Sequence, residues 1–267
     1  MKLLSLNTYC GYFFEPLMAF IEKNATDTDI FCFQELMHND ENHFHSGPFR
    51  ANFFSEISKV LKDFQGIFAP VQPGVNPDGD TDENIYFGLG IFIKNKFKIQ
   101  NNGDFFIVGD EQSYVKGQEK TLPFKIQYAQ FIIGKKLFTI CNVHGTAWPV
   151  NKLDSDERLE QSQKILSFVN KQLGEKIITG DFNLFPQTKS VTIFEEAGFR
   201  NLVKDFNISS TRGSLIKKMH PEYYAVGRVF QEFADYTFVS PGIEVKKYSV
   251  PDLPLSDHLP LILEFNI

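Results

Sequence analysis

Five short apolar runs in this chain meet a polar cluster at one end, and this pattern constrains the fold more than any other feature of the sequence. Short apolar runs of this kind fit buried β-strands. In α/β proteins, polar side chains at strand ends face the loops where binding and catalytic sites form. The sequence therefore predicts one site assembled from separate strand ends: Asn7 after KLLSL, Gln34 and Glu35 after IFCF, His144 after ICNV, Asp181 and Asn183 after KIITG, and Ser256, Asp257 and His258 before LPLILEF.

Strand-like and helical patterns are mixed along the whole chain. Apolar or alternating runs predict β-strands, and apolar residues near i, i+4 and i+7 spacing predict amphipathic helices. Residues 71–84, rich in Pro, Gly and Asp, are expected to form a loop. We expect an α/β fold in a single domain, residues 1–267, with strands at 2–7, 29–34, 85–93, 97–108, 122–133, 137–143, 176–179, 233–239, 243–250 and 259–265 and helices at 15–23, 48–64, 154–173 and 190–197.

The charge balance of the chain is acidic. It has 27 Lys and Arg against 33 Asp and Glu, a formal net charge of −6. Proteins dedicated to coating nucleic acid are usually strongly basic, which argues against that class. An enzyme acting on nucleic acid is not excluded, because a bound cation can supply the attraction locally.

The cysteines and apolar segments predict the compartment. Cys10, Cys32 and Cys141 are odd in number and form no CxxC pair, so we expect reduced core thiols and no zinc site. The tract 38–45 (HNDENHFH) lacks cysteine partners and regular spacing, and we expect a solvated loop there. No apolar run approaches the ~18 residues of a membrane span, and no signal-peptide pattern is found. We therefore expect a cytoplasmic protein with no membrane span.

The acidic strand ends suit metal and phosphate chemistry. Glu35 follows an almost wholly apolar strand, where a carboxylate either caps a turn or binds a hard cation such as Mg²⁺. Gly180 permits a sharp exit from its strand, and Asp181 and Asn183 project to the same side if the backbone is extended. A carboxylate that orients water beside an amide that holds an anion fits phosphoryl transfer, whereas an Asx-turn is the structural alternative.

Asp257 and His258 form the sharpest pair in the sequence. They could provide a carboxylate facing a metal and an imidazolium facing a phosphate, whereas a turn with a satisfied histidine is the alternative. A histidine that serves as a cation needs a carboxylate partner to raise its pKa, and Asp235 in FADYTF is the candidate. His144 in VHGTAW is the second candidate phosphate ligand.

The order of these clusters resembles the endonuclease/exonuclease/phosphatase superfamily, which includes DNase I-like nucleases, apurinic endonucleases, bacterial sphingomyelinases, inositol polyphosphate 5-phosphatases and deadenylases. Each motif alone is weak, but six in the right order over residues 3–265 are specific. The resemblance implies a four-layered α/β sandwich, in which two mixed β-sheets pack face to face with helices outside. The motifs that carry it are Asn7, Gln34-Glu35, His144, Gly180-Asp181-x-Asn183, Asp235-Tyr236 and Ser256-Asp257-His258.

The resemblance also implies roles for these residues. It implies Mg²⁺ or Mn²⁺ bound chiefly by Glu35, with Asn7 and Asp257 near the metal. Asp181 would orient and deprotonate the attacking water. Asn7 and Asn183 would hold the phosphate and position Asp181. His258, paired with Asp235, would stabilise the negative charge that builds on phosphorus. His144 would bind another phosphate oxygen. These roles agree with the physics of phosphoryl transfer, which relies on positioning and charge neutralisation.

Some positions depart from the family pattern. Apurinic endonucleases carry a tyrosine where His144 stands, so this chain is more similar to the DNase I and sphingomyelinase branches there. DNase I-like enzymes back that histidine with a glutamate on an earlier strand, but residues 86–93 contain no carboxylate. Arg212, in the polar loop before Asp235, would suit a phosphate. Trp148 is either a stacking platform for substrate or a loop anchor.

We therefore expect a Mg²⁺- or Mn²⁺-dependent phosphoester hydrolase that promotes in-line attack of water on phosphate. The commonest use of the architecture favours a phosphodiesterase acting as a nuclease, with nucleic acid as partner. The acidic charge weighs against tight DNA binding, and the alternative is a small-molecule or lipid-headgroup phosphodiesterase or a phosphatase. Basic residues around the cleft would favour the nuclease, and a closed, shallow pocket would favour the alternative. We expect a monomer.

Overall fold

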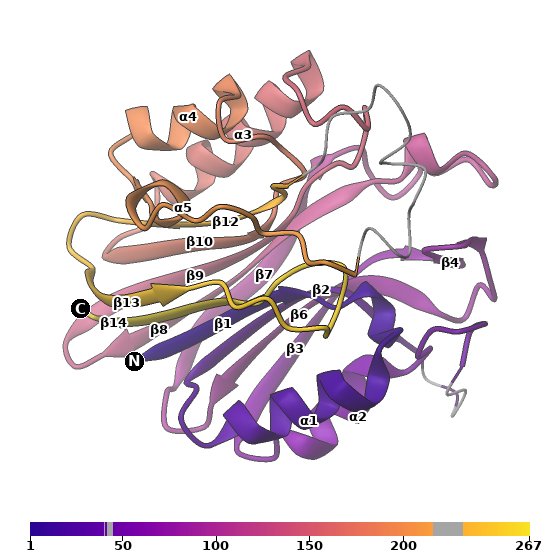
Figure 1. Cartoon of the computed structure of the whole chain (residues 1–267), viewed down its shortest axis with the longest axis horizontal. Coiled ribbons are helices and arrows are strands. Elements are labelled where there is room, and N and C mark those ends of the chain that lie inside the picture. Colours follow the sequence, from indigo (N-terminus) through magenta and orange to yellow (C-terminus); the bar gives the residue numbers. More distant parts are fainter. Residues whose placement is uncertain (40, 42–44, 216–231) are drawn as a thin grey trace.

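Two six-stranded β-sheets pack face to face in the computed structural model, which describes residues 1–39, 41, 45–215 and 232–267 (Figure 1). The first sheet contains, in spatial order, β13 (Glu244–Ser249), β14 (Leu261–Asn266), β1 (Lys2–Asn7), β2 (Ile30–His38), β6 (Tyr86–Lys94) and β3 (Phe64–Pro73). The second contains β11 (Arg200–Asn201), β12 (Asp235–Val239), β10 (Glu175–Asp181), β9 (Lys136–His144), β8 (Phe124–Ile133) and β7 (Ile99–Val108).

Both sheets are mixed, as predicted, and their parallel pairs set polar strand ends side by side. β1 runs parallel to β2, and β9 runs parallel to β10, whereas the other pairs are antiparallel. In the first sheet Asn7 is the partner of Gln34, directly before Glu35. In the second sheet Asp181 is the partner of both His144 and Asp235. The register thus gathers the predicted site residues of each sheet.

Helices form the two outer layers (Figure 1). The helices α1 (Phe14–Ala25) and α2 (Phe53–Val60) cover the first sheet, and α3 (Asp156–Val169) and α4 (Lys189–Glu196) cover the second. The short α5 (Leu202–Asp205) follows β11, and two 3₁₀ turns, η1 (Tyr9–Gly11) and η2 (Glu119–Thr121), lie in loops. The largest apolar cluster includes Leu3 and Ile91 from the first sheet and Phe131 and Ile140 from the second. The predicted four-layered sandwich is therefore confirmed.

The prediction of one helix over residues 48–64 is wrong at both ends. The helix α2 starts at Phe53 and ends at Val60, and Phe64 begins β3. Phe49 packs instead in a separate cluster with Cys10 and Met37, so its apolar side chain does not extend the helix face. The helix-like spacing of apolar residues therefore spans three separate segments: the loop at Phe49, the helix α2 and the start of β3 at Phe64.

The predicted loop over residues 71–84 contains more strand than expected. β3 continues to Pro73, and β4 (Val75–Asn76) pairs with β5 (Gly79–Asp80) in a small hairpin. Proline removes a ladder donor, so it is confined to sheet edges or bulges. β3 is the edge strand of its sheet, with a register shift between Pro70 and Gln72, and can therefore hold prolines.

A buried polar bridge joins the two sheets just below the predicted site. Gln34 Nε2 donates to Asn142 Oδ1 at 2.6 Å and to Ser5 Oγ at 3.2 Å. Asn142 Nδ2 in turn donates to the carbonyls of Phe33 at 3.0 Å and Gly90 at 3.2 Å. This inter-sheet bridge (Ser5, Gln34 and Asn142) fixes the middle of β2 relative to β9.

Other expectations are met in part. The three cysteines are free and buried, as predicted. In the ranges given above, no helix has both the length and the apolar character to cross a bilayer. Residues 40 and 42–44 of the tract 38–45 lie outside the described residues. His38 belongs to β2, and its ring packs against Phe54 and Phe68.

Candidate active site

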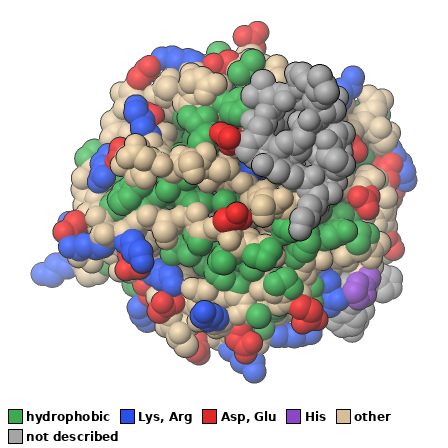
Figure 2. All heavy atoms as spheres, viewed as in Figure 1, with side chains coloured by type: hydrophobic (Ala, Val, Ile, Leu, Met, Phe, Trp, Pro, Cys, Tyr) green, Lys and Arg blue, Asp and Glu red, His purple; other side chains and the backbone are tan. Residues whose placement is uncertain are grey.

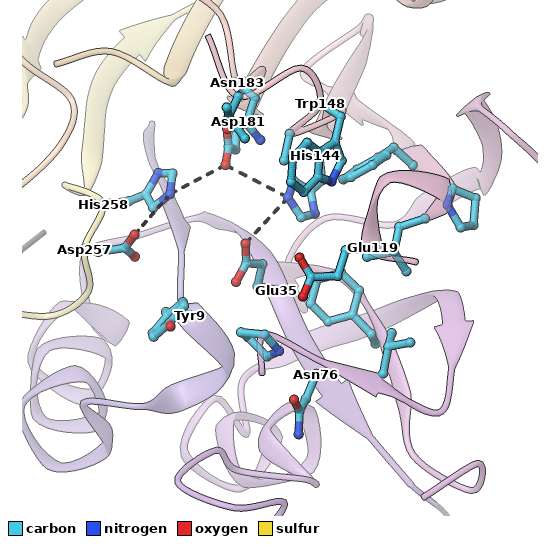
Figure 3. Close-up of a pocket in the computed structure, with 18 of the residues that line it drawn as sticks. Tyr9, Glu35, Asn76, Glu119, His144, Trp148, Asp181, Asn183, Asp257 and His258 are labelled. Carbon is cyan, nitrogen blue, oxygen red and sulfur yellow. Dashed lines mark hydrogen bonds and ion pairs between the residues drawn. The ribbon is translucent and has the colours of Figure 1, made fainter. Parts of the chain in front are cut away.

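A cavity of about 280 Å³ lies beside the ends of β9 and β10 and the bulge within β2 (Figure 3). Eight of the ten predicted site residues line it: Glu35, His144, Trp148, Asp181, Asn183, Arg212, Asp257 and His258. The remaining two, Asn7 and Asp235, are buried and bond to lining residues. The structure therefore brings all ten to one place.

Glu35 is held in an unusual backbone conformation. Its φ of 52° is left-handed, and the pairing of β2 with β6 shifts register between Phe33 and Leu36. Asn7 Nδ2 donates to Glu35 Oε1 at 2.9 Å, whereas Glu35 Oε2 is buried with no hydrogen-bond partner in the described part of the chain. Burial, followed by the nearby Asp257 carboxylate, raises the pKa of Glu35 to about 8. The bulge thus places a poorly satisfied carboxylate at the cavity.

Asp181 ends β10 and is fixed from both sides. Its Oδ2 accepts from Asn7 Nδ2 at 3.1 Å, and its Oδ1 accepts from the backbone N–H of Asn183 at 2.8 Å. Gly180 precedes it with φ 133°, and a side chain at that position would come within 2.1 Å of the Val143 carbonyl. Asn183 itself turns its Nδ2 to the Gly145 carbonyl at 3.1 Å. Asp181 therefore forms the Asx-turn that was the structural alternative and also lines the cavity.

His258 is paired with Asp235, as the sequence suggested. The Nδ1 atom of His258 lies 2.8 Å from Asp235 Oδ2, and Nε2 lies 3.6 Å from Asp181 Oδ2. Arg212 Nη1 contacts the same Nε2 atom. Burial, followed by the Arg212 charge, lowers the pKa of His258 to about 4, so the expected increase is not found here. The imidazole is therefore neutral at pH 7.

Arg212 supplies the positive charge that His258 lacks. The arginine is buried, and its Nη2 donates to Asp257 Oδ2 at 2.7 Å. Its backbone also forms an antiparallel bridge with that of His258, which holds the loop of Arg212 next to the segment that precedes β14. The carboxylates of Asp257, Asp181 and Asp235 raise its pKa further, against the effect of burial. A guanidinium remains charged in any case, so Arg212 is a permanent cation of the cavity.

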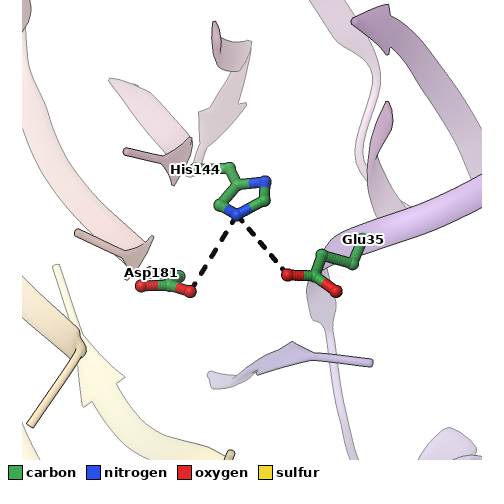
Figure 4. A group of neighbouring side chains, drawn as sticks. All are labelled: Glu35, His144 and Asp181. Atoms are coloured by element: carbon green, nitrogen blue, oxygen red, sulfur yellow. Dashed lines mark ion pairs between the residues drawn. The ribbon is translucent and has the colours of Figure 1, made fainter. Parts of the chain in front are cut away.

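His144 projects between Glu35 and Asp181 (Figure 4). Its Nε2 lies 3.6 Å from Glu35 Oε1 and 4.0 Å from Asp181 Oδ2, and within the described ranges no other carboxylate comes within 4 Å of the ring. The rings of Phe87 and Phe124 pack against it instead, with centroids 5.8 Å and 5.2 Å away. Burial lowers its pKa to about 4. The ring of His144 is therefore held by aromatic packing, and not by a β6 glutamate of the kind found in DNase I-like enzymes.

Two charged lining residues were missed by the sequence analysis. Lys152 is 4% exposed and lies in the loop after β9, and Glu119 lies in η2 at the rim. Neither residue ends a strand or belongs to a spaced motif. Their only sequence signal was a position in a loop. Many exposed charged residues lie in loops too, so this signal does not single them out.

The donor set fits a divalent cation. Ligand atoms of Glu35, His144 and Asp181 lie within 4.8 Å of one another, and so do those of Asp181, Asp235 and His258. The orphaned Glu35 Oε2 has the unmet bonding capacity expected of a metal ligand. Carboxylate oxygens are the ligands preferred by hard cations such as Mg²⁺.

A model of the Endonuclease/Exonuclease/phosphatase family matches residues 4–258, and the matched region contains every residue of the site. The chain belongs to this family. Members of the family hydrolyse phosphoesters. No curated protein matches the chain.

Solved structures of the family have the same fold. One is a mannosyl-6-phosphatase from Bacteroides thetaiotaomicron, with 19% identity and a TM-score of 0.68 over 100% of both chains. A family protein from Leptotrichia buccalis has 15% identity and a TM-score of 0.72 over 100% of both chains. The human Nocturnin catalytic domain has 15% identity and a TM-score of 0.67, covering 100% of this chain and 93% of the other. At these identities the likeness concerns the fold alone.

Proposed function

We propose that this protein is a divalent-metal-dependent hydrolase of small phosphoesters, with Mg²⁺ or Mn²⁺ as its cofactor. The observation that carries the proposal is the convergence of Glu35, Asp181 and His144 at one cavity floor, with Glu35 Oε2 left unpartnered. Mg²⁺ is usually held by one or two carboxylates together with water and substrate phosphate. Glu35 would be the chief ligand, with Asn7 and Asp257 near the metal.

The chain's own residues would do the rest of the chemistry. When bound, the cation would neutralise charge on the phosphate and polarise it for attack. Asp181 would accept a proton from the attacking water, and its bonds from Asn7 and Asn183 hold the carboxylate in place for this task. Arg212 would meet negative charge on the phosphoryl oxygens. His258 is held by Asp235 through Nδ1, so while the ring is neutral its Nε2 can only accept a hydrogen bond, as from Arg212 or from the attacking water.

The walls of the cavity favour a small substrate over a nucleic-acid polymer. In the described part of the chain, the lining includes two Lys or Arg residues, Lys152 and Arg212, and both are buried. The rest of the wall is largely apolar: Val75, Pro77, Phe87, Leu122, Pro123, Phe124, Ala147, Trp148 and Val150. Such a wall suits a compact group attached to the phosphate.

The β4–β5 hairpin beside the cavity is acidic. The β4–β5 hairpin contributes lining residues, and residues 74–84 contain Asp78, Asp80, Asp82 and Glu83 with no Lys or Arg. On the face in Figure 2, Lys and Arg lie mainly around the margin, and no continuous basic track crosses the coloured surface. Nucleic-acid affinity depends on cations that neutralise backbone phosphates. We therefore favour the small-molecule alternative over the nuclease.

Hydrolysis of matched substrates tests the proposal. Activity on p-nitrophenyl phosphate, bis-p-nitrophenyl phosphate, plasmid DNA and a single-stranded oligonucleotide would be measured with Mg²⁺ or Mn²⁺ and with EDTA. We expect metal-dependent turnover of a small ester, little cleavage of either polymer, and a loss of about 10²- to 10⁴-fold in Asp181→Asn. Efficient cleavage of DNA, lost in EDTA, would make the protein a nuclease. Turnover unchanged in Asp181→Asn would remove Asp181 from the mechanism.

A further inference from the structure

We propose that Lys152 is a substrate-binding residue, whose ammonium group binds a phosphoryl oxygen of the substrate in the cavity. This inference rests on the proposed function, because it assigns a partner to the phosphate that such a substrate would bring. Nothing in the family motifs includes Lys152, and it comes from the loop between β9 and α3. The inference stands on its burial, its hydrogen bonding and the charges around it.

The burial of Lys152 is costly without a ligand. The residue is 4% exposed, although lysine is almost never buried unless its charge is paired. An ammonium group has three N–H donors. Among the described residues, Nζ has one hydrogen-bond partner, the Phe233 carbonyl at 3.2 Å, and no carboxylate oxygen within 4 Å. Two donors thus remain for a group inside the cavity.

The backbone holds Lys152 in place at some cost. Its φ of 55° is left-handed, which is uncommon for a residue with a side chain. Its N–H donates to the Pro149 carbonyl at 3.3 Å, and its carbonyl accepts from the Phe185 N–H at 3.0 Å. The second bond ties this loop to the segment after Asp181. Strained residues of this kind are retained where the surrounding structure requires a particular side-chain position.

Lys152 lies among the charged groups of the cavity. The groups that act on it are Arg212, Asp181, Asp235 and Asp257, all of which line the cavity or support a lining residue. Burial, followed by the Arg212 charge, lowers the pKa of Lys152 to about 7. Asp181, Asp235 and Asp257 offset this repulsion from more than 4 Å away, and an anion within hydrogen-bond reach of both cations would offset it further. A bound phosphate would supply that anion.

Inorganic phosphate and one small ester test the assignment. In Lys152→Met we expect the Ki of inorganic phosphate and the KM of p-nitrophenyl phosphate to rise about 10- to 100-fold, as for loss of one charged hydrogen bond. Lys152→Arg should retain most of the binding. The matched control is Lys164→Met, because Lys164 Nζ also donates to a backbone carbonyl, that of Ile107 at 3.4 Å, outside the cavity. It should leave both constants unchanged.

Thermal unfolding separates binding from a structural role. The Tm of Lys152→Met without phosphate should equal or exceed that of the wild type, and phosphate should raise the Tm of the wild type but not of the variant. Values of Ki and KM within twofold of the wild type, or a large fall in Tm without phosphate, would overturn the assignment. If Lys152→Met fails to fold, Lys152→Gln gives the same comparison. If the wild type hydrolyses no phosphoester while this phosphate-dependent shift is seen, the proposed function fails and the binding role stands.

Discussion

Glu35 carries several unfavourable features at once, and this is informative at the scale of the residue. Its backbone is left-handed, and one of its carboxylate oxygens is buried without a partner. Two more carboxylates, Asp257 and Asp181, raise its pKa. Each feature costs free energy in the metal-free protein, and a divalent cation would offset the last two. These features are the ones we expect of the proposed metal ligand, since they do not contribute to stability.

The pH dependence of stability provides a test of this placement. The pKa of Glu35 in the folded protein, about 8, lies above its ordinary value of 4.5, so the native state holds this proton more tightly than the unfolded chain. Its contribution to stability is present at low pH and is lost as the pH rises through 4.5 to 8. In EDTA, Glu35→Gln should therefore exceed the wild type in Tm by an amount that grows with pH, reaching about 3–6 °C at pH 8.

The response to metal completes this prediction. Mn²⁺ should raise the Tm of the wild type at pH 8 and have a much smaller effect on Glu35→Gln, because the variant lacks the ligand charge. Glu22→Gln, on the exposed side of α1, is the control and should follow the wild type at every pH. A difference in Tm that does not change with pH would mean that Glu35 is already ionised in the folded metal-free protein.

At the scale of the element, the ends of β1 and β10 were predictable, whereas the end of β2 and the boundaries near α2 were not. Asn7 and Asp181 end β1 and β10, as their apolar runs predicted. The predicted strand end at Gln34 is wrong, because β2 continues through a bulge at Glu35 to His38. The ring of Phe64 packs on Phe31 across the sheet, a contact that no local pattern reveals. β3 also contains prolines that argue against a strand unless its place at the edge is known.

The same reasoning explains what was missed within the site. Lys152 and Arg212 both lie in loops, and sequence position suggested a role only for Arg212, through the resemblance to the family. The lowered pKa of His258 comes first from burial and then from a guanidinium that is 46 positions away in the sequence. Such long-range electrostatic effects become visible only when the fold brings the charges together.

The β4–β5 hairpin permits a prediction about substrate choice. Its segment carries only negative formal charges, and Tyr114 Oη donates to Asp80 Oδ1 at 2.5 Å, which links the hairpin to the loop bearing Glu119. Asp78→Lys combined with Glu83→Lys should raise the initial rate on a single-stranded oligonucleotide by about tenfold at low salt, because steering adds to the encounter rate. The gain should disappear near 0.5 M NaCl, as screening shortens the range of these charges.

Two comparisons isolate the effect of the hairpin. The rate on p-nitrophenyl phosphate should stay within twofold of the wild type, since the cavity floor is unchanged. Glu22→Lys with Glu264→Lys gives the same change in net charge at exposed positions on α1 and β14, and should leave oligonucleotide cleavage unchanged. An equal gain in this control pair would assign the effect to net charge and not to the rim.

At the scale of the whole molecule, the site depends on two sheets that are distant in sequence. Glu35 comes from the first sheet, and His144 and Asp181 come from the second. Apolar packing between the sheets is not directional, so it leaves their relative register weakly specified. The inter-sheet bridge of Ser5, Gln34 and Asn142 adds directional bonds one residue from Glu35. We infer that this bridge sets the relative position of the two halves of the site.

A double-mutant cycle tests the inter-sheet bridge. Asn142→Ala leaves Gln34 Nε2 and two buried carbonyls short of a partner, and should lower the free energy of unfolding in urea by about 2–4 kcal/mol. Adding Gln34→Ala should cost less than the sum of the single changes, with a coupling of about 1–3 kcal/mol. The control is Gln130→Ala, since Gln130 bonds to Thr139 and Gln172 without contacting the bridge, and its effect should add to that of Gln34→Ala.

Activity distinguishes a bridge that positions the site from one that only stabilises the fold. If the bridge sets the sheet register, Asn142→Ala should reduce kcat at temperatures where the variant is fully folded, because Glu35 and Asp181 then lose their fixed separation. Gln130→Ala should reduce stability without this change in kcat, since its partners lie away from the cavity. A fully active, destabilised Asn142→Ala would mean that Asn7, which bonds to both Glu35 and Asp181, is sufficient to hold the two halves together.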